Sequence, residues 1–142
     1  MKYLIAFVAS AMLIAAEAGG PATFVEHGKV SALFADKGGA IATGPGYIVS
    51  ASKRTVSGQV EVHEKETDIF HVMEGEATLV TGGKMIGGKQ TKPEQWIGTS
   101  IEGGVTYHLS KGDVVTIPAG TPHWFKDVPK LISYYVVKVV KP

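Results

Sequence analysis

The side chains in this chain that could do chemistry occur in two short stretches far apart in the sequence. The first contains Glu61 and His63, two residues apart, with Asp68 five residues further on. The second is the stretch 112–127, which contains His123. Imidazole nitrogens and carboxylate oxygens are common ligands of divalent metals. Both stretches have the pattern of extended segments, and a closed β-barrel would bring them together.

The first stretch alternates strictly between polar and apolar residues. A strand has a side-chain period of two, so Gln59, Glu61 and His63 fall on one face, and Val60 and Val62 on the other. The polar face therefore carries the candidate ligands, and the apolar face is free to pack against another layer.

Composition limits the class of protein and the ligands available to a metal. The chain has 142 residues, 44% of them hydrophobic, which suits one domain with a single core, and we assign it to residues 19–142. The formal net charge of +1 gives no electrostatic case for a nucleic-acid partner. There are no cysteines, so any bound metal must be held by nitrogen and oxygen.

The first 18 residues have the pattern of a secretory signal peptide. Lys2 provides a positive start, residues 3–16 are almost all apolar, and Ala16-Glu17-Ala18 fits the small-x-small cleavage pattern. The alternative is an uncleaved membrane anchor, but a spanning helix needs about 20 apolar residues. We therefore expect a mature protein that starts near Gly19, has no stable membrane insertion, and is secreted or periplasmic.

The rest of the chain predicts an all-β fold of about nine or ten short strands. A hairpin is expected over 68–83, with its turn at 74–76, and 84–104 is expected as a long excursion at one end of the barrel. Further extended segments are expected at Val30–Phe34, Tyr47–Ala51, Gln95–Ile101, Val105–Leu109, Val114–Pro118, His123–Lys126 and Leu131–Val140.

The second stretch resembles the second motif of the cupin superfamily, Gly-x5-Pro-x-Gly-x2-His-x3-Asn. Gly112, Pro118, Gly120 and His123 stand at the required spacings, with Asp127 where asparagine is usual. The resemblance implies a double-stranded β-helix, or jelly-roll, barrel that holds one divalent metal in its mouth.

The first stretch resembles the first cupin motif less closely. Alignment back from Gly75 puts Asp68 at the family's glutamate position, His63 at its second histidine and Glu61 at its first. The family set of three histidines and one glutamate thus becomes Glu61, His63, Asp68 and His123. His63, His123 and Asp68 alone would reproduce the two-histidine-one-carboxylate arrangement of non-haem Fe(II) sites. The expected cofactor is one divalent metal ion, Fe, Mn or Zn.

The roles of the two carboxylates stay open at this stage. Asp68 is one methylene shorter than glutamate and reaches a metal only if the chain moves inward. Glu61 is then either the ligand that supplies the carboxylate or a catalytic base beside the metal.

Other histidines and aromatic residues are weaker candidates. His71 is at odd spacing from Asp68, so we expect it outside the mouth, and His27 has no assigned role. His108 either faces the cavity as an acid or base or, as is commoner, is exposed. Phe125 shares the face of His123, whereas Trp124 points the other way. The candidate pocket residues are Gln59, Phe70, Trp96, Tyr107 and Phe125, each weighed against ordinary packing.

The resemblance implies a small-molecule metalloenzyme. The reaction is either dioxygenase-like or an isomerase or lyase reaction in which the metal acts as a Lewis acid. The alternatives are a barrel that binds a small ligand without turnover and a structural barrel that has lost metal binding. By analogy with small cupins we expect a homodimer, with Leu131–Val140 as a strand that could join an intermolecular sheet.

Overall fold

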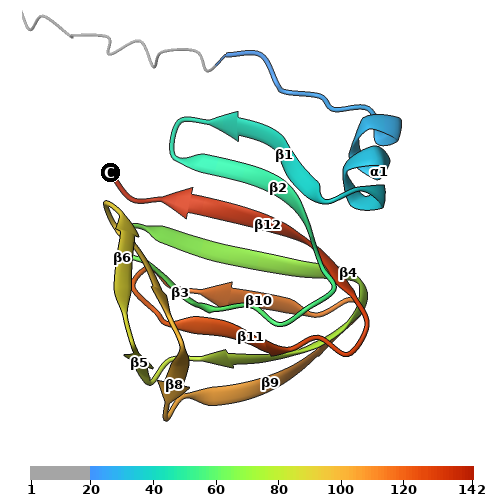
Figure 1. Cartoon of the computed structure of the whole chain (residues 1–142). Helices are drawn as coiled ribbons and strands as arrows, with labels where there is room; N and C mark the ends of the chain where they lie inside the picture. The colour runs from blue at the N-terminus through green and yellow to red at the C-terminus, as the bar shows by residue number, and fades with distance from the viewer. Residues whose placement is uncertain (1–19) are drawn as a thin grey trace, which may run out of the picture.

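Two antiparallel layers that share one long strand form the frame of the molecule (Figure 1), and their ten strands are hydrogen-bonded into one continuous sheet. The computed structural model describes residues 20–142, so the expected signal peptide lies outside the described residues. The elements are α1 (His27–Ala35), β1 (Gly38–Gly44), β2 (Tyr47–Arg54), β3 (Val60–His63), β4 (Glu66–Thr81), β5 (Lys84–Ile86), β6 (Lys89–Lys92), β7 (Gln95–Gly98), β8 (Ser100–Glu102), β9 (Val105–Ser110), β10 (Val114–Ile117), β11 (His123–Asp127) and β12 (Ile132–Val140).

The shared strand is β4. Its first half pairs with β12 and β10, and β12 continues the layer through β2 to β1. Its second half pairs with β9 and β11, and β11 continues the other layer through β3 and β7 to β6. The expected all-β jelly-roll class is therefore confirmed.

The expected hairpin over 68–83 is wrong, because β4 runs on through residues 74–76. Met73 is an extra residue opposite β12, where the register shifts, and Gly75 has φ +79°. A bulge of this kind bends a strand without ending it. The bend carries one strand from the first layer into the second, which lets Asp68 and Leu79 belong to different layers.

The core fills the space between the two layers. Leu79, Ile132, Val60 and Val72 are fully buried. Burial of such side chains stabilises the fold by about 1.5–3 kcal/mol each. Phe70, Phe125 and Tyr134 form an aromatic cluster with ring centroids 4.9–5.7 Å apart.

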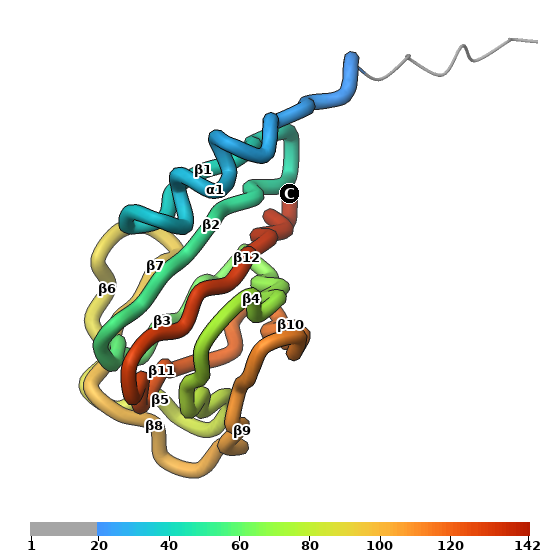
Figure 2. Tube along the Cα trace, turned by 90° about the vertical axis from the view of Figure 1, so that its right-hand side faces the viewer, coloured from blue at the N-terminus to red at the C-terminus, as the bar shows by residue number. Residues whose placement is uncertain are grey.

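The expected strand at Val30–Phe34 is wrong, because these residues lie in α1. Val30, Leu33 and Phe34 also have the spacing of one helix face, and a short apolar run does not distinguish the two periods. The helix lies beside β1 and β2 in both views (Figure 2), and the Phe34 ring meets that of Tyr135 edge-on at 4.9 Å. Its nine residues are too few to cross a membrane, and the described part of the chain has no helix that is long and apolar enough to do so.

The segment 84–104 lies at one end of the layers, where β5 pairs with β8 and β6 pairs with β7 (Figure 1). Because β7 also pairs with β3, this excursion is joined to the strand that carries Glu61 and His63. Strand β12 has both edges paired, so it cannot extend an intermolecular sheet in this fold. The homodimer itself stays a prediction.

Candidate metal centre

Four candidate ligands from three strands converge on one point. Strand β3 supplies Glu61 and His63, β4 supplies Asp68, and β11 supplies His123, whose Cα pairs with that of Glu61. The Nε2 atom of His63 lies 3.5 Å from Oε2 of Glu61 and 3.6 Å from Oδ2 of Asp68. The Nε2 atom of His123 lies 3.9 Å from the same Asp68 oxygen.

Both histidine rings are oriented by acceptors on their Nδ1 side. His63 donates its Nδ1–H to Oε1 of Gln95, and His123 donates its Nδ1–H to the carbonyl oxygen of Thr121 at 3.1 Å. These bonds leave the Nε2 lone pairs directed at the carboxylates. A hydrogen-bonded Nδ1 with a free Nε2 is the usual arrangement of metal-binding histidines.

The turn between β10 and β11 fixes the second histidine. Gly120 has φ +81°, which favours glycine, and its N–H donates to the carbonyl oxygen of His63 at 2.8 Å. The N–H of Thr121 donates to Pro118 at 3.1 Å, which holds the Thr121 carbonyl where His123 can reach it. The motif residues thus tie both histidines to one turn.

Burial keeps the second histidine neutral. His123 is 5% exposed, and this burial lowers its pKa below the ordinary value, although its hydrogen bond to Thr121 and the nearby carboxylates oppose the effect. A neutral imidazole is the form that binds a metal.

Lys138 pairs with the carboxylate of Asp68. Its Nζ lies 2.8 Å and 3.1 Å from the two Asp68 oxygens and 2.9 Å from Oε2 of Glu66. Burial opposes charge on Lys138 and Glu66, but their hydrogen bonds and mutual attraction outweigh it. The pKa of Lys138 is therefore raised and that of Glu66 lowered. The carboxylate of Asp68, which is only 3% exposed, is thus paired with an ammonium group.

Glu61 is held from the other side by Arg54. Nη2 of Arg54 donates to Oε1 of Glu61 at 3.1 Å, and Nε of Arg54 donates to the Tyr134 hydroxyl at 3.1 Å. Burial would lower the pKa of Arg54, but these two partners outweigh it and the pKa is raised. The second carboxylate oxygen of Glu61 stays directed at His63.

The donor set fits a divalent ion. Two groups of donor atoms lie within 4.8 Å of one another: Glu61 with His63 and His123, and His63 with Glu66 and Asp68. In the second group the ammonium of Lys138 already bridges the two carboxylates. The first needs only small movements, because ligands about 2.1 Å from one ion stand about 3.0–3.4 Å apart. The buried group could therefore bind a metal ion through Glu61, His63 and His123, with Asp68 within reach.

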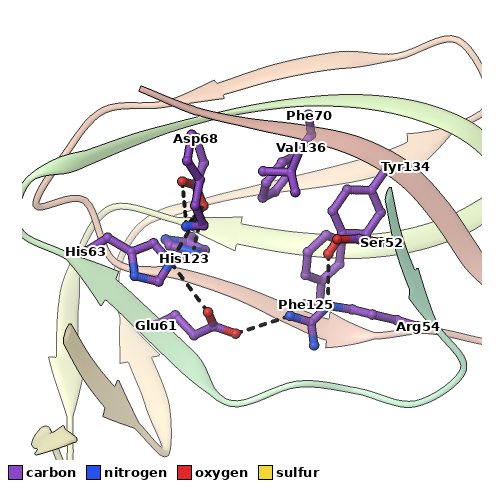
Figure 3. A pocket seen from close by; sticks show the side chains of 11 residues that line it. Ser52, Arg54, Glu61, His63, Asp68, Phe70, His123, Phe125, Tyr134 and Val136 are labelled. Carbon is purple, nitrogen blue, oxygen red and sulfur yellow. Dashed lines mark hydrogen bonds and ion pairs between the residues drawn. The ribbon is translucent and has the colours of Figure 1, made fainter. Parts of the chain in front are cut away.

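The four donors lie at one end of a cavity of about 200 Å³ between the layers. Figure 3 shows Glu61, His63, Asp68 and His123 together at this end, with Arg54 and the aromatic rings beyond them. The cavity is lined by Ser52, Arg54, Glu61, His63, Asp68, Phe70, His123, Phe125, Tyr134, Val136 and Lys138.

Strand parity explains which expected pocket residues reach this cavity. Phe70 and Phe125 line it, since each lies two residues from a candidate ligand on the same strand. Trp96 pairs with Val62, so it shares the opposite face of β3, and its Nε1 donates to Glu64. Gln59 is exposed in the loop before β3, where the strand period does not apply. Tyr107 is 44% exposed on β9, which β4 and β11 separate from β3.

The remaining histidines lie outside the cavity. His71 is exposed on β4, on the face of the strand opposite to Asp68. His108 is exposed on β9, 3.4 Å from the Thr78 hydroxyl, and His27 is exposed in α1. Trp124 also lies outside the lining, and its Nε1 donates to the carbonyl oxygen of Gly58 at 2.8 Å.

Sequence reasoning missed seven residues that surround the centre: Ser52, Arg54, Glu66, Gln95, Tyr134, Val136 and Lys138. Lys138 had a signal, because it is a lone charge in the apolar run 131–140 and shares the parity of Tyr134 and Val136. Arg54 and Gln95 had none, since each reaches the site only through strand pairing.

Known folds are similar to this one. A Bacillus halodurans protein, BH2720, has a TM-score of 0.59 and 18% identity over 87% of this chain and 85% of its own. The cupin domain of Cnp3 from Schizosaccharomyces pombe has a TM-score of 0.53 and 10% identity over 73% of this chain and 60% of its own. The fold is that of the cupins.

A third structure, KdgF from Halomonas sp., has a TM-score of 0.52 and 17% identity over 74% of this chain and 80% of its own. No model of a protein family matches the sequence, and no curated protein sequence does either. At these identities the likeness to other cupin barrels establishes the fold alone, so a function must be argued from the site.

Proposed function

We propose that this cupin barrel is a divalent-metal-dependent enzyme that acts on a small molecule in the cavity described above. One observation carries the proposal: His63 and His123 each use Nδ1 as a donor to a fixed acceptor, so both Nε2 lone pairs meet carboxylates inside a partly enclosed cavity. A purely structural site would have no need of two free imidazole nitrogens facing two carboxylates.

We assign Glu61 as a ligand and not as the catalytic base. Its Oε1 accepts from Arg54, which fixes the position of the carboxylate and leaves Oε2 for the metal. Asp68 is the further carboxylate, and its pairing with Lys138 weakens it as a donor. Neither carboxylate is then free to remove a proton from a substrate.

The reaction class that this arrangement favours is oxygenation. Two histidines with one or two carboxylates suit Fe(II), which would supply redox chemistry and open coordination positions for a substrate and dioxygen. The chain's own part is to hold the ion, to orient the substrate, and to exclude water with Phe70, Phe125 and Val136, which line the cavity.

A Lewis-acid isomerase or lyase reaction is the second candidate, because the cavity contains proton donors. Burial raises the pKa of Tyr134 above its ordinary value, so its phenol stays protonated at neutral pH. The ammonium of Lys138 also faces the cavity. Either group could deliver a proton to a substrate whose carbonyl a metal polarises.

Metal analysis tests the centre directly. Protein stripped of metal and reconstituted with Fe(II), Mn(II) or Zn(II) should bind one ion per chain. His63→Ala and His123→Ala should each lose most of that metal. The matched control is His71→Ala, which removes an exposed histidine from β4 and should still bind one metal ion per chain. Full occupancy in His123→Ala would overturn the site.

Turnover assays then separate the reaction classes. The Fe(II) form should consume oxygen with a member of a panel of diketones and phenols, and the same panel without oxygen tests isomerisation by the Zn(II) and Mn(II) forms. A metal-loaded protein that converts nothing under either condition would support the alternative of a non-catalytic ligand-binding barrel.

We propose in addition that the protein acts outside the cytoplasm, in a secreted or periplasmic form. The support is the sequence pattern of residues 1–18. Intact-mass measurement of protein exported by a bacterial host should give a chain that starts near Gly19. A full-length chain retained in the cytoplasm would contradict the proposal.

A further inference from the structure

The cavity has a second polar end, which is joined to the metal centre through the carboxylate of Glu61. Arg54 lies there, beside the Tyr134 hydroxyl and over the ring of Phe125, with its guanidinium carbon 4.9 Å from the ring centroid. Figure 3 shows this end on the opposite side of the cavity from His63 and Asp68. Resting on the proposed function, we propose that Arg54 binds the carboxylate group of the substrate.

The guanidinium is held rigidly but keeps donors to spare. One hydrogen bond goes from Nε to Tyr134, one goes from Nη2 to Glu61, and one face covers Phe125. A guanidinium has five N–H donors, so these bonds leave three on the two terminal nitrogens. The side chain is 30% exposed, which leaves this edge accessible. A fixed planar fork of this kind matches a carboxylate.

Gly58 leaves space for the guanidinium group of Arg54. A Cβ atom at this position would stand 2.9 Å from Nη1 of Arg54, too close for an undisturbed contact. The φ of Gly58 is not in the left-handed region, so alanine is tolerated by the backbone and only the guanidinium must move. The position therefore offers a way to displace Arg54 without removing its charge.

The charge balance of the cavity favours an anion. Arg54 and Lys138 carry two positive charges among the lining residues, and Glu61 and Asp68 carry two negative ones. A bound divalent ion would then give the cavity a net charge of plus two. Glu66 binds Lys138 from outside the lining, and counting its charge lowers the net charge to plus one. Opposite charge attracts strongly where water is partly excluded.

Size and walls restrict the anion further. A cavity of about 200 Å³ is smaller than those that hold drug-sized ligands, typically about 300–1,000 Å³. Phe70, Phe125 and Val136 would pack on the apolar part. The substrate class that fits is a small carboxylate with a short hydrocarbon body.

Calorimetric titration with four small molecules tests whether Arg54 binds a carboxylate. Butanoate and 2-oxobutanoate, with butanamide and 2-oxobutanamide as neutral partners, are titrated into the Zn(II)-loaded and the metal-stripped protein. The carboxylates should bind more tightly than the amides, and Arg54→Gln should weaken carboxylate binding by about 10- to 100-fold. Gly58→Ala should weaken it in the same direction while every charge remains.

The matched control is Lys53→Gln, which removes a cation from the opposite face of the same strand and should leave carboxylate binding unchanged. If both Arg54→Gln and Gly58→Ala still bind zinc and keep the wild-type affinity for carboxylates, Arg54 does not bind the substrate carboxylate. That result would leave the proposed metal centre standing. Failure of the wild type to bind zinc would overturn the proposed function itself. Tighter, Arg54-dependent binding of inorganic phosphate would overturn the assignment to a carboxylate.

Discussion

Replacing Gln95 by alanine removes the acceptor that orients the ring of His63. Gln95 lies directly opposite His63 in the β3–β7 pair, so the two side chains share a face. Its Oε1 accepts from Nδ1 of His63, and a hydrogen bond between its side chain and Glu66 contributes to the lowered pKa of Glu66. The amide thus holds the imidazole with Nε2 toward the metal centre. In Gln95→Ala the ring is free to rotate, and the tautomer with Nδ1 free becomes accessible.

The magnitude follows from what remains beside the ring. Loss of the hydrogen bond behind a metal-binding histidine typically costs 10- to 100-fold in affinity, or about 1.4–2.7 kcal/mol. The nearest remaining carboxylate oxygen is Oε2 of Glu66, 3.9 Å from Nδ1. That distance is too long for a hydrogen bond but short enough to attract the N–H. We therefore expect the lower end of the range, about tenfold.

Competition titration of Zn(II) against a chromophoric chelator measures this loss, and imidazole nitrogen NMR reports the tautomer of His63. Gln90→Ala is the matched control, because Gln90 is exposed on the neighbouring strand β6 and should leave zinc affinity unchanged. Wild-type affinity in Gln95→Ala, with the His63 tautomer unaltered, would refute the claim that Gln95 orients the ligand.

Three further predictions concern stability. Lys138→Met leaves buried carboxylate charge unpaired, so the metal-free protein should lose about 1–3 kcal/mol of unfolding free energy in urea. Added Zn(II) should restore part of it, and equal stability without metal would contradict the pairing. Gly75→Ala should be destabilised by more than about 1–3 kcal/mol, because the new Cβ would overlap the carbonyl oxygen of Leu131 at φ +79°. Gly82→Ala, with φ +76° and open space around it, is the control that carries only the backbone strain; equal melting temperatures for the two variants would refute the overlap. Burial raises the pKa of Tyr134 above 10.0, so an unfolded chain releases this proton at lower pH than the folded one. Stability should therefore fall as pH rises above 10.0, and Tyr134→Phe should flatten that fall in alkaline unfolding curves.

Local patterns were informative wherever the physical cause was itself local. Strict alternation placed Glu61 and His63 on one face, and the parity of Asp68 and Phe70 placed both toward the interior. The pattern failed at Gln59, because the strand begins only at Val60.

Two secondary-structure predictions failed because a short sequence supports more than one conformation. Val30–Phe34 fits a helix face as well as a strand, and contact with Tyr135 on the outer face of the sheet accompanies the helix. At Gly75, glycine can end a strand or bend it. Here the strand bends, because β4 pairs with β12 before Gly75 and with β9 and β11 after it.

The residues around the ligands were beyond prediction for a different reason. Gln95 reaches His63 because β7 pairs with β3, and Lys138 reaches Asp68 because β12 pairs with β4 in a register that sets the two opposite each other. The partners of each pair are separated by 32 and 70 residues. No local pattern specifies such a register, since it depends on the packing of whole strands.

The sequence by itself determined the class of fold, the turn that carries His123, and the face on which Glu61 and His63 lie. Each of these depends on backbone preferences and side-chain periods that act over a few residues. Only the tertiary structure decided that Glu61 is bound by Arg54, that Asp68 is paired with Lys138, and that the histidines present Nε2. These facts depend on charges and hydrogen bonds between segments that meet only when the two layers close around the cavity.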